Sequence, residues 1–144
     1  MLLRPSISLA ALLCLLFFAP SQAKCPWALI HIRGNINGKA PAGVHFDFSV
    51  ESTTPGDSQK KIRQESAIHG SNFEATLYFD TFESMHNGTH VCARKPRAVT
   101  LSLVSASQTI SKEVLTIQND FRRTEEGDYE ILQPLVVPIA SGEN

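Results

Sequence analysis

The stretch Val44-His-Phe-Asp-Phe-Ser-Val50 alternates apolar and polar residues without an error. Val44, Phe46, Phe48 and Val50 point to one side of an extended chain, and the residues between them point to the other. This period of two is typical of an antiparallel strand with one buried and one solvent-facing side. The fold should therefore be built from such strands.

Other segments repeat the pattern. Phe73 to Asp80 alternates equally well, and Ile30 to Arg33 and Val99 to Leu103 are shorter examples. Weaker candidates are 61–68, 89–94, 109–117 (with a bulge near 113–117) and 129–137. Segment 119–126 is predicted to be a loop, with one helical turn as the alternative. The inward-facing residues of the clearest strands should form one core: Phe46, Phe48, Phe73, Leu77, Phe79, Leu101 and Leu103.

Turn signals separate these strands. Asn37-Gly38, Pro55-Gly56, Gly70-Ser-Asn72, Asn87-Gly88 and Gly127-Asp128 supply residues that tolerate positive φ. Asn87-Gly88 is the pair best suited to a tight hairpin. Seven or eight short strands with such spacing predict an all-β, antiparallel β-sandwich, such as an Ig-like sandwich, or a small barrel.

The N-terminal segment has the layout of a secretory signal. Arg4 precedes an apolar run from Leu9 to Ala19, and small residues follow up to Ala23. A run of about 11 residues is short for a membrane span, which needs ~20. We therefore expect residues 1–23 to be cleaved, residues 24–138 to form the sandwich and residues 139–144 to be a flexible tail. The protein is then secreted or periplasmic, with no membrane span after cleavage.

Two cysteines remain after that cleavage, Cys25 and Cys92. In an oxidising compartment they are expected to form one disulfide, which the chain-entropy model values at ~4 kcal/mol for a loop of this length.

The opening of this region resembles the carboxypeptidase regulatory-like and transthyretin-like domains. The resemblance lies in Gly34-Asn-Ile-Asn-Gly38 followed by Lys39-Ala-Pro-Ala-Gly-Val44, and later in Gly70-Ser-Asn-Phe73, and it covers residues 29 to about 103. Members of these families are usually non-catalytic modules of exported proteins. The resemblance therefore implies a module that binds a partner or supports a larger assembly.

The composition agrees with a binding module. The formal net charge is −1, with 13 basic and 14 acidic side chains, which argues against a nucleic-acid binder. No nucleophile elbow, zinc-protease motif or phosphate-binding glycine loop occurs, so we expect no catalytic site and no cofactor. The partner is expected to be a protein or a glycan. Tyr78, opposite the apolar face of its strand, is a candidate contact, and the favoured alternative is an ordinary cross-strand partner on that side of the sheet.

One alternative comes from another functional class. His86 and His90 flank the Asn87-Gly88 turn, and Cys92 follows on the face of His90, so the three form a hypothetical zinc or copper site. Bonding of Cys92 to Cys25 would remove its thiolate. His31 and His45 are expected to face solvent on adjacent strands, where they could be neighbours. Asn87-Gly-Thr89 also matches the N-glycosylation pattern, which matters in a eukaryotic source.

Overall fold

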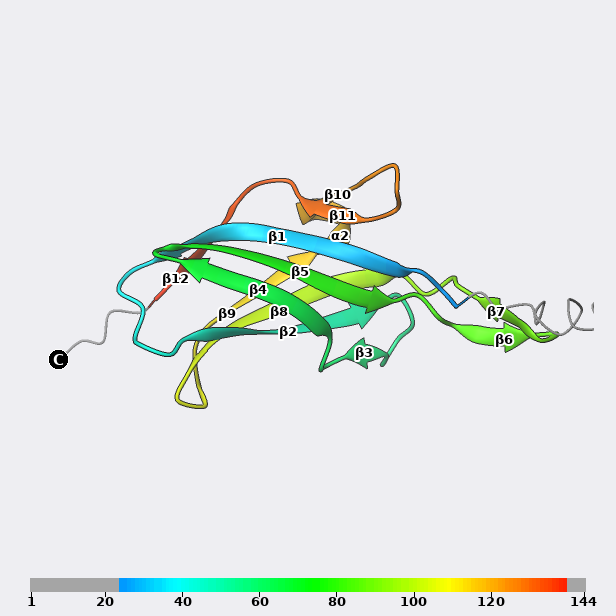
Figure 1. Ribbon diagram of the computed structural model, residues 1–144, viewed down its shortest axis with the longest axis horizontal. Helices are drawn as coiled ribbons and strands as arrows, with labels where there is room; N and C mark the ends of the chain where they lie inside the picture. The colour runs from blue at the N-terminus through cyan, green and yellow to red at the C-terminus, as the bar shows by residue number, and fades with distance from the viewer. Residues whose placement is uncertain (1–23, 140–144) are drawn as a thin grey trace, which may run out of the picture.

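The computed structural model describes residues 24–139, and these residues fold into an all-β structure. Two sheets lie face to face, and a small hairpin projects beyond one end of them (Figure 1). The expected signal segment, residues 1–23, and residues 140–144 lie outside the described residues.

The larger sheet has six strands. Its order is β10-β11-β1-β5-β4, and β12 also pairs with β1. The strands are β1 (Trp27–Asn37), β4 (Arg63–His69), β5 (Asn72–Asp80), β10 (Phe121–Arg123), β11 (Tyr129–Ile131) and β12 (Leu135–Pro138).

The smaller sheet has four strands in the order β3-β2-β8-β9. They are β2 (His45–Ser52), β3 (Ser58–Gln59), β8 (Pro96–Ser105) and β9 (Gln108–Thr116). A separate pair, β6 (Ser84–His86) and β7 (Thr89–Val91), makes the projecting hairpin. One helical turn, α2 (Ile117–Asp120), connects β9 to β10.

The core lies between the two sheets, where their alternating apolar sides meet. Phe46 of β2 packs on Phe73 of β5 with ring centroids 4.4 Å apart. All seven residues expected to share a core are buried in one cluster, so that prediction is confirmed. Gln64 on the edge strand β4 adds a polar link between the layers, because its Nε2 donates to the Phe46 carbonyl oxygen at 2.8 Å.

The expectation of seven or eight purely antiparallel strands was wrong. Twelve strands are present in residues 24–139, and β1 pairs in parallel with both β11 and β12. The single strand expected over 129–137 is interrupted at residues 132–134. Pro134 has no N–H to give to the ladder, and the Leu132 N–H instead donates to the Asp120 carbonyl oxygen at 2.8 Å.

Three local predictions also need correction. Segment 119–126 is not a loop throughout, because it contains the end of α2 and all of β10.

The bulge expected in β9 does not lie at 113–117. It lies opposite the step from Leu103 to Val104 of β8, where Ile110 has no partner in the ladder. The alternation fails near Val114 because this side chain is apolar but solvent-exposed on an edge strand. Ile139, assigned to the tail, donates its N–H to the Asn37 carbonyl oxygen and packs against the core.

Candidate functional site

A disulfide joins the start of β1 to the base of the projecting hairpin. Cys25 and Cys92 are bonded, as the sequence predicted, with Cα atoms 5.4 Å apart and a separation of 67 positions in sequence. An isolated two-stranded hairpin is at best marginally stable in water, so this covalent link contributes directly to holding β6 and β7 in place.

Next to this disulfide, aromatic side chains gather on the outer side of the six-stranded sheet. Trp27 pairs with Asp80, and Tyr78 pairs with Leu29 on one side and Arg63 on the other. Paired residues share a face of the sheet, and the residues that alternate with them in β1 and β5 are buried in the core, so these five side chains face outward. The Trp27 and Tyr78 rings meet edge to face with centroids 6.4 Å apart. Trp27 keeps half of its surface exposed, at 50%.

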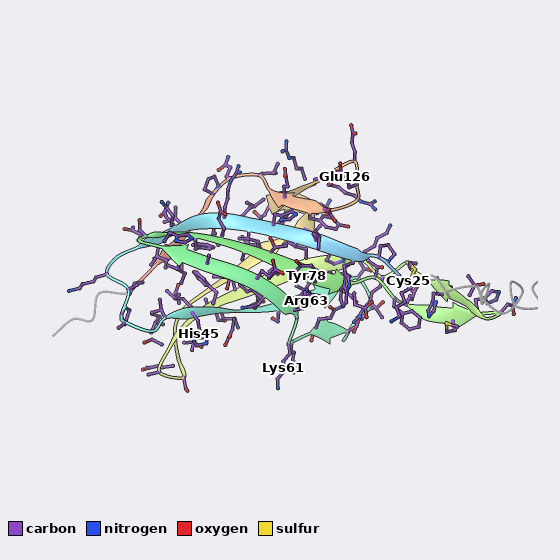
Figure 2. All side chains as sticks on the ribbon, in the orientation of Figure 1. Cys25, His45, Lys61, Arg63, Tyr78 and Glu126 are labelled. Atoms are coloured by element: carbon purple, nitrogen blue, oxygen red, sulfur yellow. A yellow bond between two sulfur atoms is a disulfide. The ribbon has the colours of Figure 1, made fainter. Side chains whose placement is uncertain are left out.

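Tyr78 is held by side chains of the neighbouring strand β4, as an ordinary cross-strand partner would be. The Arg63 guanidinium lies over its ring, 4.5 Å from the centroid, and Figure 2 shows the two side chains together. The Tyr78 hydroxyl donates to the Glu65 carboxylate at 2.9 Å, and this hydrogen bond raises the pKa of Tyr78. Tyr78 is thus half-buried on the outer face, where it supports Trp27, which is the more accessible ring.

A shallow pocket opens beside Trp27. It has a volume of about 290 Å³ and is lined by Lys24, Cys25, Trp27, Asp80, Phe82 and His90. Phe82 is 36% exposed, and its ring meets the His90 ring edge-on with centroids 5.5 Å apart. The pocket therefore combines aromatic surface with a carboxylate, an imidazole and an amine.

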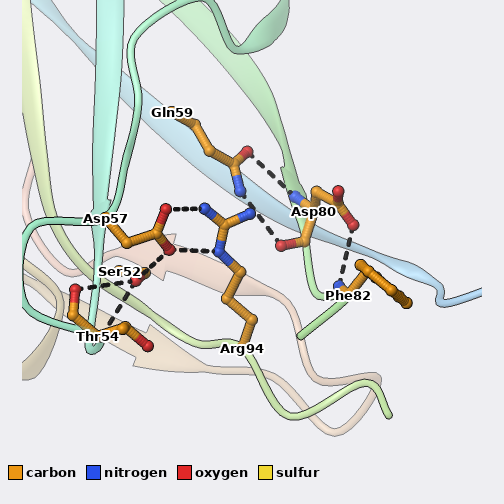
Figure 3. Close-up of polar contacts among 7 residues, drawn as sticks. All are labelled: Ser52, Thr54, Asp57, Gln59, Asp80, Phe82 and Arg94. Carbon is orange, nitrogen blue, oxygen red and sulfur yellow. Dashed lines mark hydrogen bonds and ion pairs between the residues drawn. The ribbon is translucent and has the colours of Figure 1, made fainter. Parts of the chain in front are cut away.

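A hydrogen-bond network fixes the segment that carries Asp80 and Phe82 (Figure 3). The Gln59 side chain binds the backbone of Asp80 twice, accepting from its N–H at 3.3 Å and donating to its carbonyl oxygen at 3.2 Å. Asp80 Oδ1 in turn accepts the Phe82 N–H at 3.0 Å. The backbone N–H of Arg94 donates to the Thr81 carbonyl oxygen, which ties this segment to the connection between β7 and β8.

The Arg94 side chain anchors the other side of the network. Its guanidinium binds both oxygens of the Asp57 carboxylate, with the Nε–Oδ2 distance 2.6 Å, and both side chains are largely shielded from water. The buried Ser52 hydroxyl donates to the same carboxylate at 2.6 Å. The Arg94 hydrogen bond first, and the Ser52 hydrogen bond second, lower the pKa of Asp57. The loop over residues 53–57 is therefore fastened to the hairpin base by a charged, bidentate contact.

The histidines of the hypothetical metal site are not brought together. The Asn87-Gly88 turn forms as predicted, with φ of 48° and 76° at its two central residues. In this register His86 pairs with Thr89, and His90 pairs with Met85. Paired residues share a face and adjacent residues do not, so His86 and His90 lie on opposite faces of the hairpin. Cys92 is oxidised, and residues 24–139 contain no cluster of three or more metal-binding side chains.

The structure also gives the positions of the remaining candidate residues, Asn87, His31 and His45. Asn87 is exposed at the hairpin tip, and its glycosylation stays a prediction. His31 and His45 are not neighbours, because they belong to different sheets. His45 is exposed, whereas His31 is half-buried and its Nδ1 lies 3.1 Å from the Thr76 hydroxyl.

Sequence reasoning missed Trp27 and Phe82. The signal for Trp27 was present, because the alternation Ala28, Ile30, Ile32 directs the intervening residues outward. Phe82 lies beyond β5, where no periodicity reports the direction of a side chain.

No family model, curated protein or solved structure matches this chain. Within residues 24–139, no helix has both the length and the apolar content that a membrane span needs.

Proposed function

We propose that the protein is an exported, non-catalytic β-sandwich module, Ig-like or transthyretin-like in type, that binds a protein or glycan partner. Its binding surface is the aromatic end, which we define as Trp27, Tyr78, Phe82, Met85 and His90. The Cys25–Cys92 disulfide supports export, because such bonds persist in oxidising compartments. The two face-to-face sheets with one shared core support the sandwich type.

The observation that carries the proposal is the exposure of Trp27 next to a rigid framework. Of the six large apolar side chains that are exposed in residues 24–139, Trp27, Phe82 and Met85 belong to this one end. Clustered exposed apolar groups mark interaction sites, and Trp, Tyr and Arg are the residue types that contribute most to interface energy. Trp27, Tyr78 and Arg63 are in contact here in a single row.

The framework lowers the cost of binding. Tyr78 is held by Arg63 and Glu65. The Phe82 backbone is held by Asp80, and its ring contacts the ring of His90. Side chains that are already ordered lose little conformational freedom when a partner covers them.

Capture from the native extracellular fraction tests the proposal. The exported protein and a Trp27→Ala variant are immobilised, and the material that each retains is identified by mass spectrometry. A Leu132→Ala variant is the matched control, because Leu132 is exposed to a similar extent, 52%, but lies outside the aromatic end. A partner that is retained by wild type and by the control but not by Trp27→Ala supports the surface.

The proposed lack of catalytic activity is tested separately. Purified protein should show no turnover across panels of hydrolase substrates. Turnover that is abolished by one substitution of a histidine or aspartate would overturn the proposal.

A further inference from the structure

The pocket beside Trp27 has the chemistry of a sugar-binding site. A pyranose ring presents an apolar face of C–H groups and a rim of hydroxyls, so it needs a flat aromatic surface together with planar polar groups. Trp27 and Phe82 supply partly exposed aromatic rings, and Asp80 and His90 supply the polar groups.

Asp80 is well placed to bind hydroxyls. Its Oδ1 accepts the Phe82 N–H, which fixes the orientation of the carboxylate (Figure 3). Its Oδ2 carries no hydrogen bond within residues 24–139 and remains free to accept from a ligand hydroxyl. The His90 ring is oriented by its edge contact with Phe82.

The charges around the pocket favour a neutral ligand. Lys24 and Asp80 line it with side chains of opposite formal charge. An ion of either sign therefore meets one like and one opposite side-chain charge and gains no unopposed attraction. A neutral, hydroxyl-rich ligand can donate a hydrogen bond to Asp80 and accept one from Lys24, so it can bind both groups.

We propose that this pocket binds one pyranose unit of a neutral glycan, with the sugar ring stacked on Trp27 and its hydroxyls bound by Asp80 and His90. This inference rests on the proposed function and narrows the partner from a protein or glycan to a glycan. The clamp of Gln59 on Asp80 and the nearby Cys25–Cys92 bond keep the pocket formed without a ligand.

The single tryptophan of the chain makes the test direct. Trp27 is the only indole in the protein, so its fluorescence reports on this pocket alone. The exported protein is titrated separately with neutral hexasaccharides of glucose, xylose, mannose and N-acetylglucosamine. A saturable change in emission with at least one of them is the expected result.

Two variants and one control localise the effect. Phe82→Ala removes the second ring, and Asp80→Asn keeps the size and the acceptor oxygen but removes the charge. Each should weaken binding roughly tenfold or more, the scale of an interface anchor. Leu132→Ala should bind like wild type, and circular dichroism checks that every variant is folded.

Other outcomes overturn the inference. No emission change with any of the four neutral sugars rejects it, as does tight binding of polygalacturonate, heparin or a lysine-rich peptide in their place. If the capture experiment finds a Trp27-dependent protein while the sugars fail, the binding module stands and the glycan assignment falls. If Trp27→Ala retains every partner of wild type, the proposed function itself fails.

Discussion

Replacing Gly34 by alanine should detach the last described strand from the sheet. Gly34 lies inside β1 opposite Leu135 of β12, and a Cβ built on it would be 2.1 Å from the Leu135 carbonyl oxygen and 2.8 Å from Phe73 Cε1. Neither neighbour can give way easily. The first is backbone, and the second is a fully buried ring packed on Phe46.

Two opposing effects set the magnitude. Alanine restricts the unfolded chain and would stabilise the protein by about 0.4–1 kcal/mol if it fitted. Displacing β12 exposes Val137, whose surface is now fully buried, at a cost of about 1.5–3 kcal/mol, and it also breaks the ladder to β1. The steric effect dominates, and we expect a net loss of roughly 2 kcal/mol from a total stability of about 5–15 kcal/mol.

Denaturant unfolding measures the total loss, and amide hydrogen exchange locates it. Protection should fall at residues 135–137 and at Ile139 and should persist in β5. Asn35→Ala is the control, because Asn35 neighbours Gly34 in the same strand and pairs with Val136 without such a steric conflict. A Gly34→Ala variant that is as stable as wild type, with β12 still protected, would refute the reasoning.

Three further predictions concern other parts of the fold. Ala106 and Ser107 in the β8–β9 turn have positive φ, at 47° and 66°, which Asn and Gly adopt more easily. Replacing them by Asn and Gly should therefore raise the free energy of unfolding, measured in denaturant, by about 1–2 kcal/mol. An unchanged denaturation midpoint would contradict this prediction. Asp57→Asn should lower the melting temperature at neutral pH. Because the pKa of Asp57 is lowered in the folded state, the carboxylate stabilises the protein fully above the ordinary aspartate pKa of about 4, and this stabilisation is lost as the pH falls below that value. The melting temperatures of the variant and wild type should therefore converge in acid. A difference in melting temperature that persists unchanged in acid would exclude this ion pair as the cause. Phe79→Ala should cost ~3–5 kcal/mol, because the ring is fully buried, and an unchanged melting temperature would show that the β5 faces are misassigned.

The sides of the strands were predictable because alternation depends only on neighbouring residues. Phe46 and Phe48, or Leu77 and Phe79, must face the same way in any extended chain, whatever lies opposite. The Asn87-Gly88 hairpin was predictable for the same local reason, since its residues suit positive φ.

The pairing of strands was not predictable in this way. Alternation does not identify a partner, so nothing local indicates that β1 accepts β11 and β12 in parallel. The β8–β9 turn was also missed, because Ala106 and Ser107 are not residues that signal positive φ.

Contacts between distant side chains were equally hidden. The Asp57–Arg94 pair joins residues 37 positions apart, and either residue alone is typical of a solvated surface. The pocket has the same origin, because its residues come from the start of β1, the end of β5 and the hairpin.

The position of β1 has a consequence for the biogenesis of the protein. Its neighbours on one side, β11 and β12, are the last of the described strands to be synthesised. The Leu29 N–H donates to the carboxylate of Asp128, 99 residues further along the chain, so this hydrogen bond cannot form until Asp128 has been synthesised. During synthesis or export, one side of the central strand therefore stays open after β5 has paired with the other. Such an open edge invites association with other chains, and contacts between distant residues slow folding. For a protein exported as proposed above, we expect a holding chaperone at the translocation exit to matter more than for one whose first and last strands are not paired.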